Sequence, residues 1–237
     1  MAMQGLKELY EIRFSAEDRA KKDAVWKVLC DCFFSRYVKP TDTILDIACG
    51  YGEFSNHIEA GRKIAIDLNP DAKKYLKDDV ELYLSSASAM DKIDSSSIDV
   101  CFSSNFFEHL PDRQTMDDVL KEAFRVLKPN GRYVAMQPNI RYEPGRYWDY
   151  YDHVLPLSHL SCKEAFEKAG FIVEEVIPKF VPFSTSSRLP QWPILVRLYL
   201  AFPPIWWLLG GQFVIVARKP SRMLGKSNAV HQKKRID

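Results

Sequence analysis

The chain has 237 residues, of which 46% are hydrophobic and 27% are charged, and its formal net charge is +2. This length suits one large α/β domain and leaves little for a second. The charge is uneven, because residues 218–237 carry seven basic side chains and one acidic one, a net +6 that leaves −4 on the rest. A mildly acidic body lacks the basic stripe of nucleic-acid-binding folds, so we expect no nucleic-acid partner.

The first residues are charged and have helical periodicity, which predicts an N-terminal helical cap over residues 1–39 and no secretory signal. Pro40 is expected to end this cap. The cysteines are odd in number and form no C-x-x-C pair, which predicts reduced thiols, a cytoplasmic location and no metal site. These cysteines are Cys30, Cys32, Cys49, Cys101 and Cys162.

After Pro40, strand-like and helix-like patterns alternate, which predicts a parallel sheet with helices on both faces in a domain over residues 40–219. Strands are expected at residues 44–48, 63–68, 80–84, 98–103, 131–137, 171–180 and 212–218. Helices are expected at residues 54–60, 70–76, 113–126 and 162–169.

Residues 182–211 form an apolar insert before the last expected strand. Residues 198–217 contain no charged side chain, and this run of 20 has the length of a membrane-spanning helix. Prolines and glycines interrupt the run, so we expect no span. Two alternatives remain: a buried insert that covers a binding site, or an apolar surface over residues 189–211 that rests on a membrane.

The basic segment 220–237 is rich in Lys, Ser, Asn and Gln and is expected to be a disordered tail. A tail of this kind suits anionic lipid, which fits the membrane alternative for the insert. The simpler interpretation is a solvated tail that only aids solubility.

The most informative stretch is a short apolar run at residues 44–48 that carries Asp46 and is followed by Gly50 and Gly52. A strand, a glycine turn and a helix together allow a ligand to touch bare backbone. A carboxylate at this turn disfavours a phosphate and favours a cationic or amino-bearing ligand. Ser55 stands where a dinucleotide fingerprint has its third glycine, and no P-loop pattern is present.

A second acid, Asp67, ends the next apolar run. It follows the glycine turn at about the 20-residue spacing at which an acid reaches ribose hydroxyls in a βαβ unit. A carboxylate accepts hydrogen bonds from both hydroxyls of a diol. The two acids therefore predict a nucleoside ligand with positive charge, whereas glycines that only pack a helix on a strand would leave both acids without a partner.

At this point the chain resembles the class I S-adenosylmethionine-dependent methyltransferases, of the small bacterial type. The resemblance covers residues 40–140 and rests on five segments in the family's order: LDIACGYG at 45–52, IDLN at 66–69, SIDVCFSS at 97–104, FEHL at 107–110 and VLKPNGR at 126–132. It implies a Rossmann-like, doubly wound, seven-stranded and mostly parallel sheet with an antiparallel last strand. It also implies S-adenosyl-L-methionine as the cofactor.

The resemblance also implies roles for individual residues in binding this cofactor. Gly50 and Gly52 would let the backbone approach the methionine part, with Ala48 in the place of a common glycine, and Asp46 would lie near the amino group. Asp67 would bind the ribose. The adenine would lie between Leu68 and the loop with Ser86 and Ala87, where many relatives carry an acid. Asn105 would face the transferred methyl group.

The reaction implied is displacement at the sulfonium methyl, which needs alignment and exclusion of water. A hydroxyl acceptor also needs a base, for which His109, His153 and His159 are the candidates. The alternative for His109 is a structural role at a helix start, and for the other two a hydrogen bond to loop backbone. We expect a hydroxyl acceptor on a small molecule, lipid or glycan precursor; the alternatives are an N-methyltransferase or a non-catalytic, membrane-associated cofactor-binding module.

Overall fold

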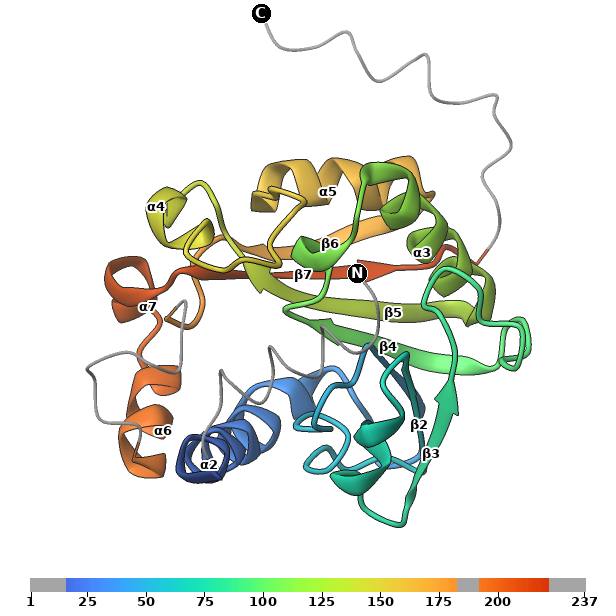
Figure 1. Cartoon of the computed structure of the whole chain (residues 1–237), viewed down its shortest axis with the longest axis horizontal. Helices are drawn as coiled ribbons and strands as arrows, with labels where there is room; N and C mark the ends of the chain where they lie inside the picture. The colour runs from blue at the N-terminus through green and yellow to red at the C-terminus, as the bar shows by residue number, and fades with distance from the viewer. Residues whose placement is uncertain (1–15, 183–191, 222–237) are drawn as a thin grey trace, which may run out of the picture.

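Seven strands form one sheet in the described part of the chain, with the order β3-β2-β1-β4-β5-β7-β6 (Figure 1). The computed structural model describes residues 16–182 and 192–221. Strands β1 to β5 pair in parallel, and β7 pairs antiparallel with both β5 and β6. The strands are β1 Thr43–Ile47, β2 Arg62–Asp67, β3 Val80–Leu84, β4 Ile98–Ser104, β5 Leu127–Pro138, β6 Ile172–Ile177 and β7 Gln212–Arg218. This topology confirms the predicted fold class.

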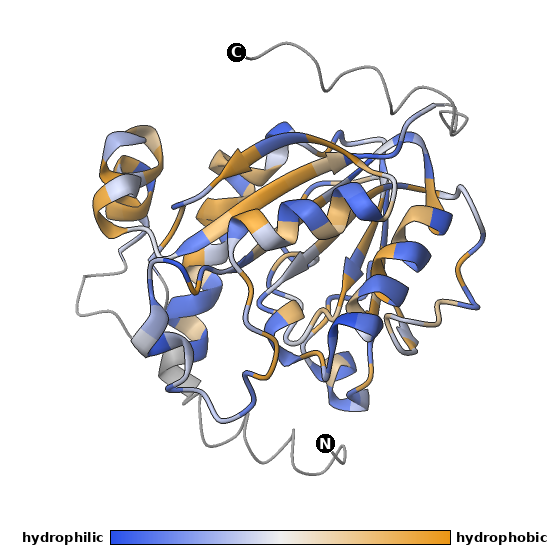
Figure 2. Cartoon of the chain, turned by 90° about the horizontal axis from the view of Figure 1, so that it is seen from above, coloured by the Kyte–Doolittle hydropathy of each residue, from blue (hydrophilic) through white to orange (hydrophobic). Residues whose placement is uncertain are grey.

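Helices cover both faces of the sheet, as Figure 1 shows. Side chains that alternate along a strand point to opposite faces, so Leu45 and Ile47 join one hydrophobic core and Ile44 joins the other. The first core lies under α3 Arg113–Val126 and α5 His159–Lys168. The strands are largely hydrophobic along their length, whereas the covering helices mix hydrophobic and hydrophilic residues (Figure 2).

The second core lies under α2 Ala16–Cys32, a short turn of 3₁₀ helix at Phe34–Arg36, and two helices of the apolar insert. These two helices are α6 Pro193–Ala201 and α7 Pro204–Leu209. The predicted N-terminal cap is therefore present as α2 where the chain is described, while residues 1–15 lie outside the described residues. Most of the predicted basic tail, residues 222–237, also lies outside them.

Three predicted helices differ from those observed. Residues 54–60 form successive turns instead of a regular helix, with Asn56 N donating to Gly52 O and Ile58 N to Phe54 O. The segment at 70–76 is a 3₁₀ helix over Pro70–Lys74, capped by the Asn69 side chain. Helix α5 begins three residues before the predicted start, because the Ser158 side chain caps it in a capping box.

The insert is partly buried and partly exposed. Leu200 and Trp206 are buried against the second core, whereas Trp207 is 63% exposed. The uncharged run at 198–217 is divided among α6, α7 and β7, and within the described residues no helix is long and apolar enough to cross a membrane.

Candidate active site

A cavity of about 360 Å³ opens at the carboxyl ends of the parallel strands, where ligands of open α/β sheets bind. Eight of the nine predicted cofactor residues line it: Asp46, Ala48, Gly50, Asp67, Leu68, Ser86, Ala87 and Asn105. Gly52 is the ninth and is absent from the lining. The fold thus brings together residues that are far apart in the sequence.

Asp67, at the end of β2, is held by two backbone amides. Gly50 N donates to Oδ2 at 2.8 Å and Asn69 N donates to Oδ1 at 2.7 Å. Burial raises the pKa of Asp67, while both hydrogen bonds oppose that rise. The acid is therefore fixed in one orientation at the cavity wall, beside the glycine turn.

The two glycines of the turn serve different purposes. Both have positive φ, +55° at Gly50 and +74° at Gly52. A Cβ on Gly50 would meet no atom within 4 Å, so this backbone faces open space in the cavity. A Cβ on Gly52 would lie 2.4 Å from Cδ2 of Leu76, so this glycine is required by packing. Ala48 has φ +57°, a left-handed conformation that favours glycine.

Asp46 is buried in β1 and accepts a hydrogen bond of 2.5 Å from the Ser55 hydroxyl. Burial raises the pKa of Asp46 to about 7, although the Ser55 hydrogen bond lowers it. Ser55 entered the sequence analysis only as a missing glycine. Its actual partner lies nine residues away, and no local pattern predicts that contact.

Helix α2 supplies a wall of the cavity that the sequence analysis did not predict. Trp26 lines the cavity and packs edge-on against Phe102 of β4, with ring centroids 6.1 Å apart. Lys22, also in the lining, forms a 2.7 Å ion pair with Glu53 in the segment after the glycine turn. The N-terminal helix is therefore part of the site.

The loops after β2, β3 and β4 form the other side of the cavity. Leu68 is 56% exposed, so its apolar side chain is accessible to a planar ring such as adenine. The Ser86 hydroxyl lies 2.9 Å from that of Ser88. Asn105 has φ +48°, and its amide donates to Ser104 Oγ at 3.1 Å. These residues lie on the side of the cavity where the adenine and the methyl group are expected.

The predicted histidines lie at different places. His109 lines the cavity, and its Nδ1 lies 3.1 Å from the backbone oxygen and 3.2 Å from Oδ2 of Asp152, which also lines it. His153 lies behind His109, with ring centroids 5.1 Å apart, and stacks on Tyr150. Asp152 comes from a loop 43 residues away, and the sequence did not predict its contact with His109.

His159 lies apart from the cavity. It is the first residue of α5, its Nδ1 is 3.0 Å from the Asn139 amide, and its ring stacks on Tyr142. Burial lowers the pKa of His159, which keeps the ring neutral. His159 lies outside the lining of the cavity, and its ring nitrogen meets the Asn139 side chain instead of the loop backbone that the alternative expected.

Comparison with known proteins agrees with this geometry. Residues 45–135 match the model of the methyltransferase domain family. No curated protein matches the chain.

Among solved structures, a chain from the complex of the Haloferax volcanii Trm112 methyltransferase activator with a methyltransferase is similar at TM-score 0.63 and 21% identity, over 87% of this chain and 95% of that one. A methyltransferase from Archaeoglobus fulgidus is similar at TM-score 0.61 and 22% identity, over 84% of this chain and 94% of that one. The geranyl diphosphate C-methyltransferase of Streptomyces coelicolor is similar at TM-score 0.56 and 16% identity, over 82% of this chain and 78% of that one.

Residues 45–135 are therefore a methyltransferase domain, and the whole sheet has the class I methyltransferase fold. The family match over residues 45–135 and the fold agree with the resemblance to S-adenosylmethionine-dependent methyltransferases and with the cofactor that it implies.

Proposed function

We propose that the protein transfers the methyl group of S-adenosylmethionine to a hydroxyl of a small molecule, lipid or glycan precursor. The observation that carries this proposal is that one cavity is lined by the predicted cofactor residues, including Asp46 and Asp67, and also by His109. In such a transfer the sulfur–methyl bond breaks as the oxygen–methyl bond forms, and the hydroxyl proton must leave.

The His109 end of the cavity supports a hydroxyl acceptor, because a hydroxyl must lose its proton while an amine needs only to be neutral. His109 is held by Asp152 through Nδ1, so its Nε2 is the nitrogen available on the other side of the ring. A histidine oriented by a carboxylate is a recurring arrangement for accepting or directing a proton. An amine acceptor would not require this arrangement.

The acceptor class is tested by supplying the protein with S-adenosylmethionine that carries a ¹³C methyl group, together with fractionated lipid and metabolite extracts. The ¹³C chemical shift of the labelled product distinguishes an O-methyl from an N-methyl group. An O-methyl product is expected. An N-methyl product, or full turnover in His109→Ala, would contradict the proposal, and His57→Ala serves as the control because His57 is outside the cavity lining.

We also propose that the α6–α7 segment rests on a lipid surface, which would bring the site to an amphipathic acceptor. Seven large apolar residues of this segment are at least 38% exposed: Trp192, Ile194, Leu195, Leu198, Phe202, Trp207 and Leu208. Exposed apolar area of this kind marks interaction sites, and tryptophan favours the membrane interface. Arg197 is the one charged residue within α6 and α7.

Sedimentation with anionic vesicles tests this contact. The protein is expected to pellet with the vesicles, and the double variant Trp207→Ser, Leu208→Ser is expected to remain in the supernatant. Trp148→Ser is the matched control, because Trp148 is 54% exposed but lies outside the segment. Equal sedimentation of both variants, or no sedimentation of the unaltered protein, would exclude the contact.

A further inference from the structure

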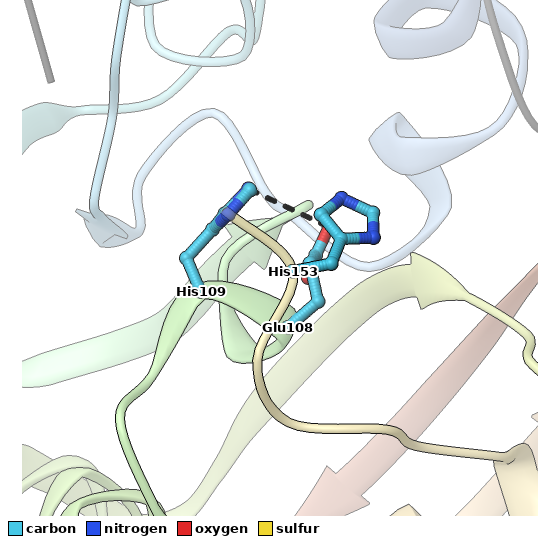
Figure 3. A group of neighbouring side chains, drawn as sticks. All are labelled: Glu108, His109 and His153. Atoms are coloured by element: carbon cyan, nitrogen blue, oxygen red, sulfur yellow. Dashed lines mark ion pairs between the residues drawn. The ribbon is translucent and has the colours of Figure 1, made fainter. Parts of the chain in front are cut away.

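Three side chains with metal-binding atoms meet beside the cavity. Glu108, His109 and His153 each offer one donor atom, and these atoms lie within 4.8 Å of one another (Figure 3). His109 Nε2 and Glu108 Oε1 lie 3.9 Å apart. Glu108 and His109 come from the turn after β4, and His153 from the loop after β5, so the fold alone brings them together.

The contacts of His109 with Asp152 leave Nε2 of the ring as a hydrogen-bond acceptor. Nδ1 lies within 3.2 Å of two oxygens of Asp152, a backbone carbonyl and a carboxylate, and both of them only accept hydrogen bonds. Nδ1 therefore carries the proton of the neutral ring, and Nε2 presents a lone pair. That lone pair faces the carboxylate of Glu108, which is also an acceptor.

Glu108 provides a second, independent sign of a missing partner. Its side chain is only 2% exposed, and Oε2 is buried without a hydrogen-bond partner. A buried carboxylate oxygen of this kind costs free energy unless a cation or a donor satisfies it. In Figure 3 the carboxylate lies between the two imidazole rings.

We propose that Glu108, His109 and His153 bind a divalent first-row transition ion such as Zn²⁺, with an open coordination position toward the cavity. Two imidazoles and one carboxylate are a donor set for such ions, and three protein ligands with an open position are typical of catalytic zinc. Donors about 2.0–2.2 Å from one Zn²⁺ span at most about 4.4 Å, so the 3.9 Å pair already fits one ion, and the other separations, up to 4.8 Å, would shorten slightly when the ion binds.

Asp152 completes the arrangement around the ion. A histidine that binds a metal through one nitrogen usually donates its other N–H to a carboxylate or a backbone carbonyl, which fixes the ring and raises its basicity. His109 makes both of these contacts with Asp152. His153 is held in turn by stacking on Tyr150 and by an edge contact with Tyr147.

The role of the ion rests on the proposed function. An acceptor hydroxyl bound at the open position would lose its proton more readily, because a divalent cation stabilises the alkoxide. The proton would pass to solvent, and His109 would act as a ligand. The cysteine spacing of the sequence predicted no metal site, but this cluster contains no cysteine.

The test is a Zn²⁺ titration of the untagged, metal-stripped full chain by calorimetry, followed by the visible absorption of the Co²⁺-loaded protein. One equivalent of Zn²⁺ is expected to bind. His153→Ala and Glu108→Gln are each expected to weaken binding by at least about 10-fold. His57→Ala should bind as the unaltered chain does, because His57 pairs with Asp23 and is not part of the cluster.

Circular dichroism of each variant checks folding, and His153→Ala carries the test if Glu108→Gln does not fold. No Zn²⁺ binding by the folded chain, or unchanged binding by His153→Ala, would overturn the metal proposal. S-adenosylhomocysteine binding is measured separately, so a failed metal site is distinguishable from a failed methyltransferase function.

Discussion

Gly50 and Asp67 are joined by a 2.8 Å hydrogen bond from the backbone amide of the first to Oδ2 of the second. This bond ties the glycine turn after β1 to the end of β2. Each oxygen of Asp67 accepts one backbone amide and keeps further acceptor capacity, so the acid is oriented while still able to bind a ribose diol. The cofactor site is thus preorganised by the sheet.

The two glycines of the turn should respond differently to alanine. Gly50→Ala places its methyl group in open cavity space, so we expect the cofactor affinity to fall by at least about 10-fold. The strain of a side chain at positive φ should cost about 1 kcal/mol of folding stability. Gly52→Ala forces its methyl group against Leu76, so we expect a larger loss of stability, about 1–3 kcal/mol from overpacking added to strain.

Urea unfolding and calorimetry with S-adenosylhomocysteine measure both quantities for each variant. The double variant Gly52→Ala, Leu76→Ala removes the clashing Cδ2 atom. Its loss of unfolding free energy should therefore be smaller than the sum of the losses in the two single variants. Additive losses in that double variant, or an unaltered affinity in Gly50→Ala, would contradict the geometry.

Asp46 should make stability depend on pH. Burial raises its pKa to about 7 in the folded protein, so the folded state keeps this proton to higher pH than the unfolded chain does. Its contribution to stability is therefore full below about pH 4 and is lost as pH rises through about 7, by up to a few kcal/mol. Asp46→Asn should flatten this slope in urea unfolding measured across that window.

Asp46 should also make cofactor affinity rise with pH, whereas its contribution to stability falls with pH. A cationic amino group favours the ionised form of Asp46, so affinity should rise between about pH 6 and pH 8, and binding below pH 7 should release a proton. Calorimetry in two buffers of different ionisation enthalpy measures that proton. Proton uptake, or an unchanged pH dependence in Asp46→Asn, would exclude this role.

Trp26 should stabilise the N-terminal helix on the sheet as well as line the cavity. It is 6% exposed, so Trp26→Ala is expected to lower the free energy of unfolding by about 3–5 kcal/mol. Trp148→Ala is the control, since that side chain is 54% exposed and should change stability by no more than about 0.5 kcal/mol. Urea unfolding followed by circular dichroism compares the two, and equal losses would contradict the packing role.

The sheet was predictable from the sequence because each strand is a short apolar run bounded by turn residues. The run at residues 80–84 and the helix at 113–126 were predicted with the observed bounds. The helix at 54–60 was predicted wrongly, since periodicity could not reveal that the Ser55 hydroxyl bonds Asp46 and that the segment closes by separate turns.

Much of the candidate site was also predictable, because parallel strands end at one edge and their terminal acids must meet there. The part of the lining that comes from α2 was not predictable, because the sequence around Lys22 and Trp26 shows only the periodicity of a helix that packs on a core. The contact of His109 with Asp152, and its approach to His153, depend on how one long loop folds back over another. No local pattern contains that information.

Calorimetric titration with S-adenosylhomocysteine tests the central claim most directly. The folded chain should bind one equivalent, and Asp67→Ala should weaken binding by about 1–3 kcal/mol, the scale for losing a charged hydrogen-bond partner. Asp79→Ala is a matched control, because Asp79 pairs with Lys63 outside the cavity lining. No binding by the folded, unaltered chain, or equal affinity in Asp67→Ala, would contradict the cofactor site described here.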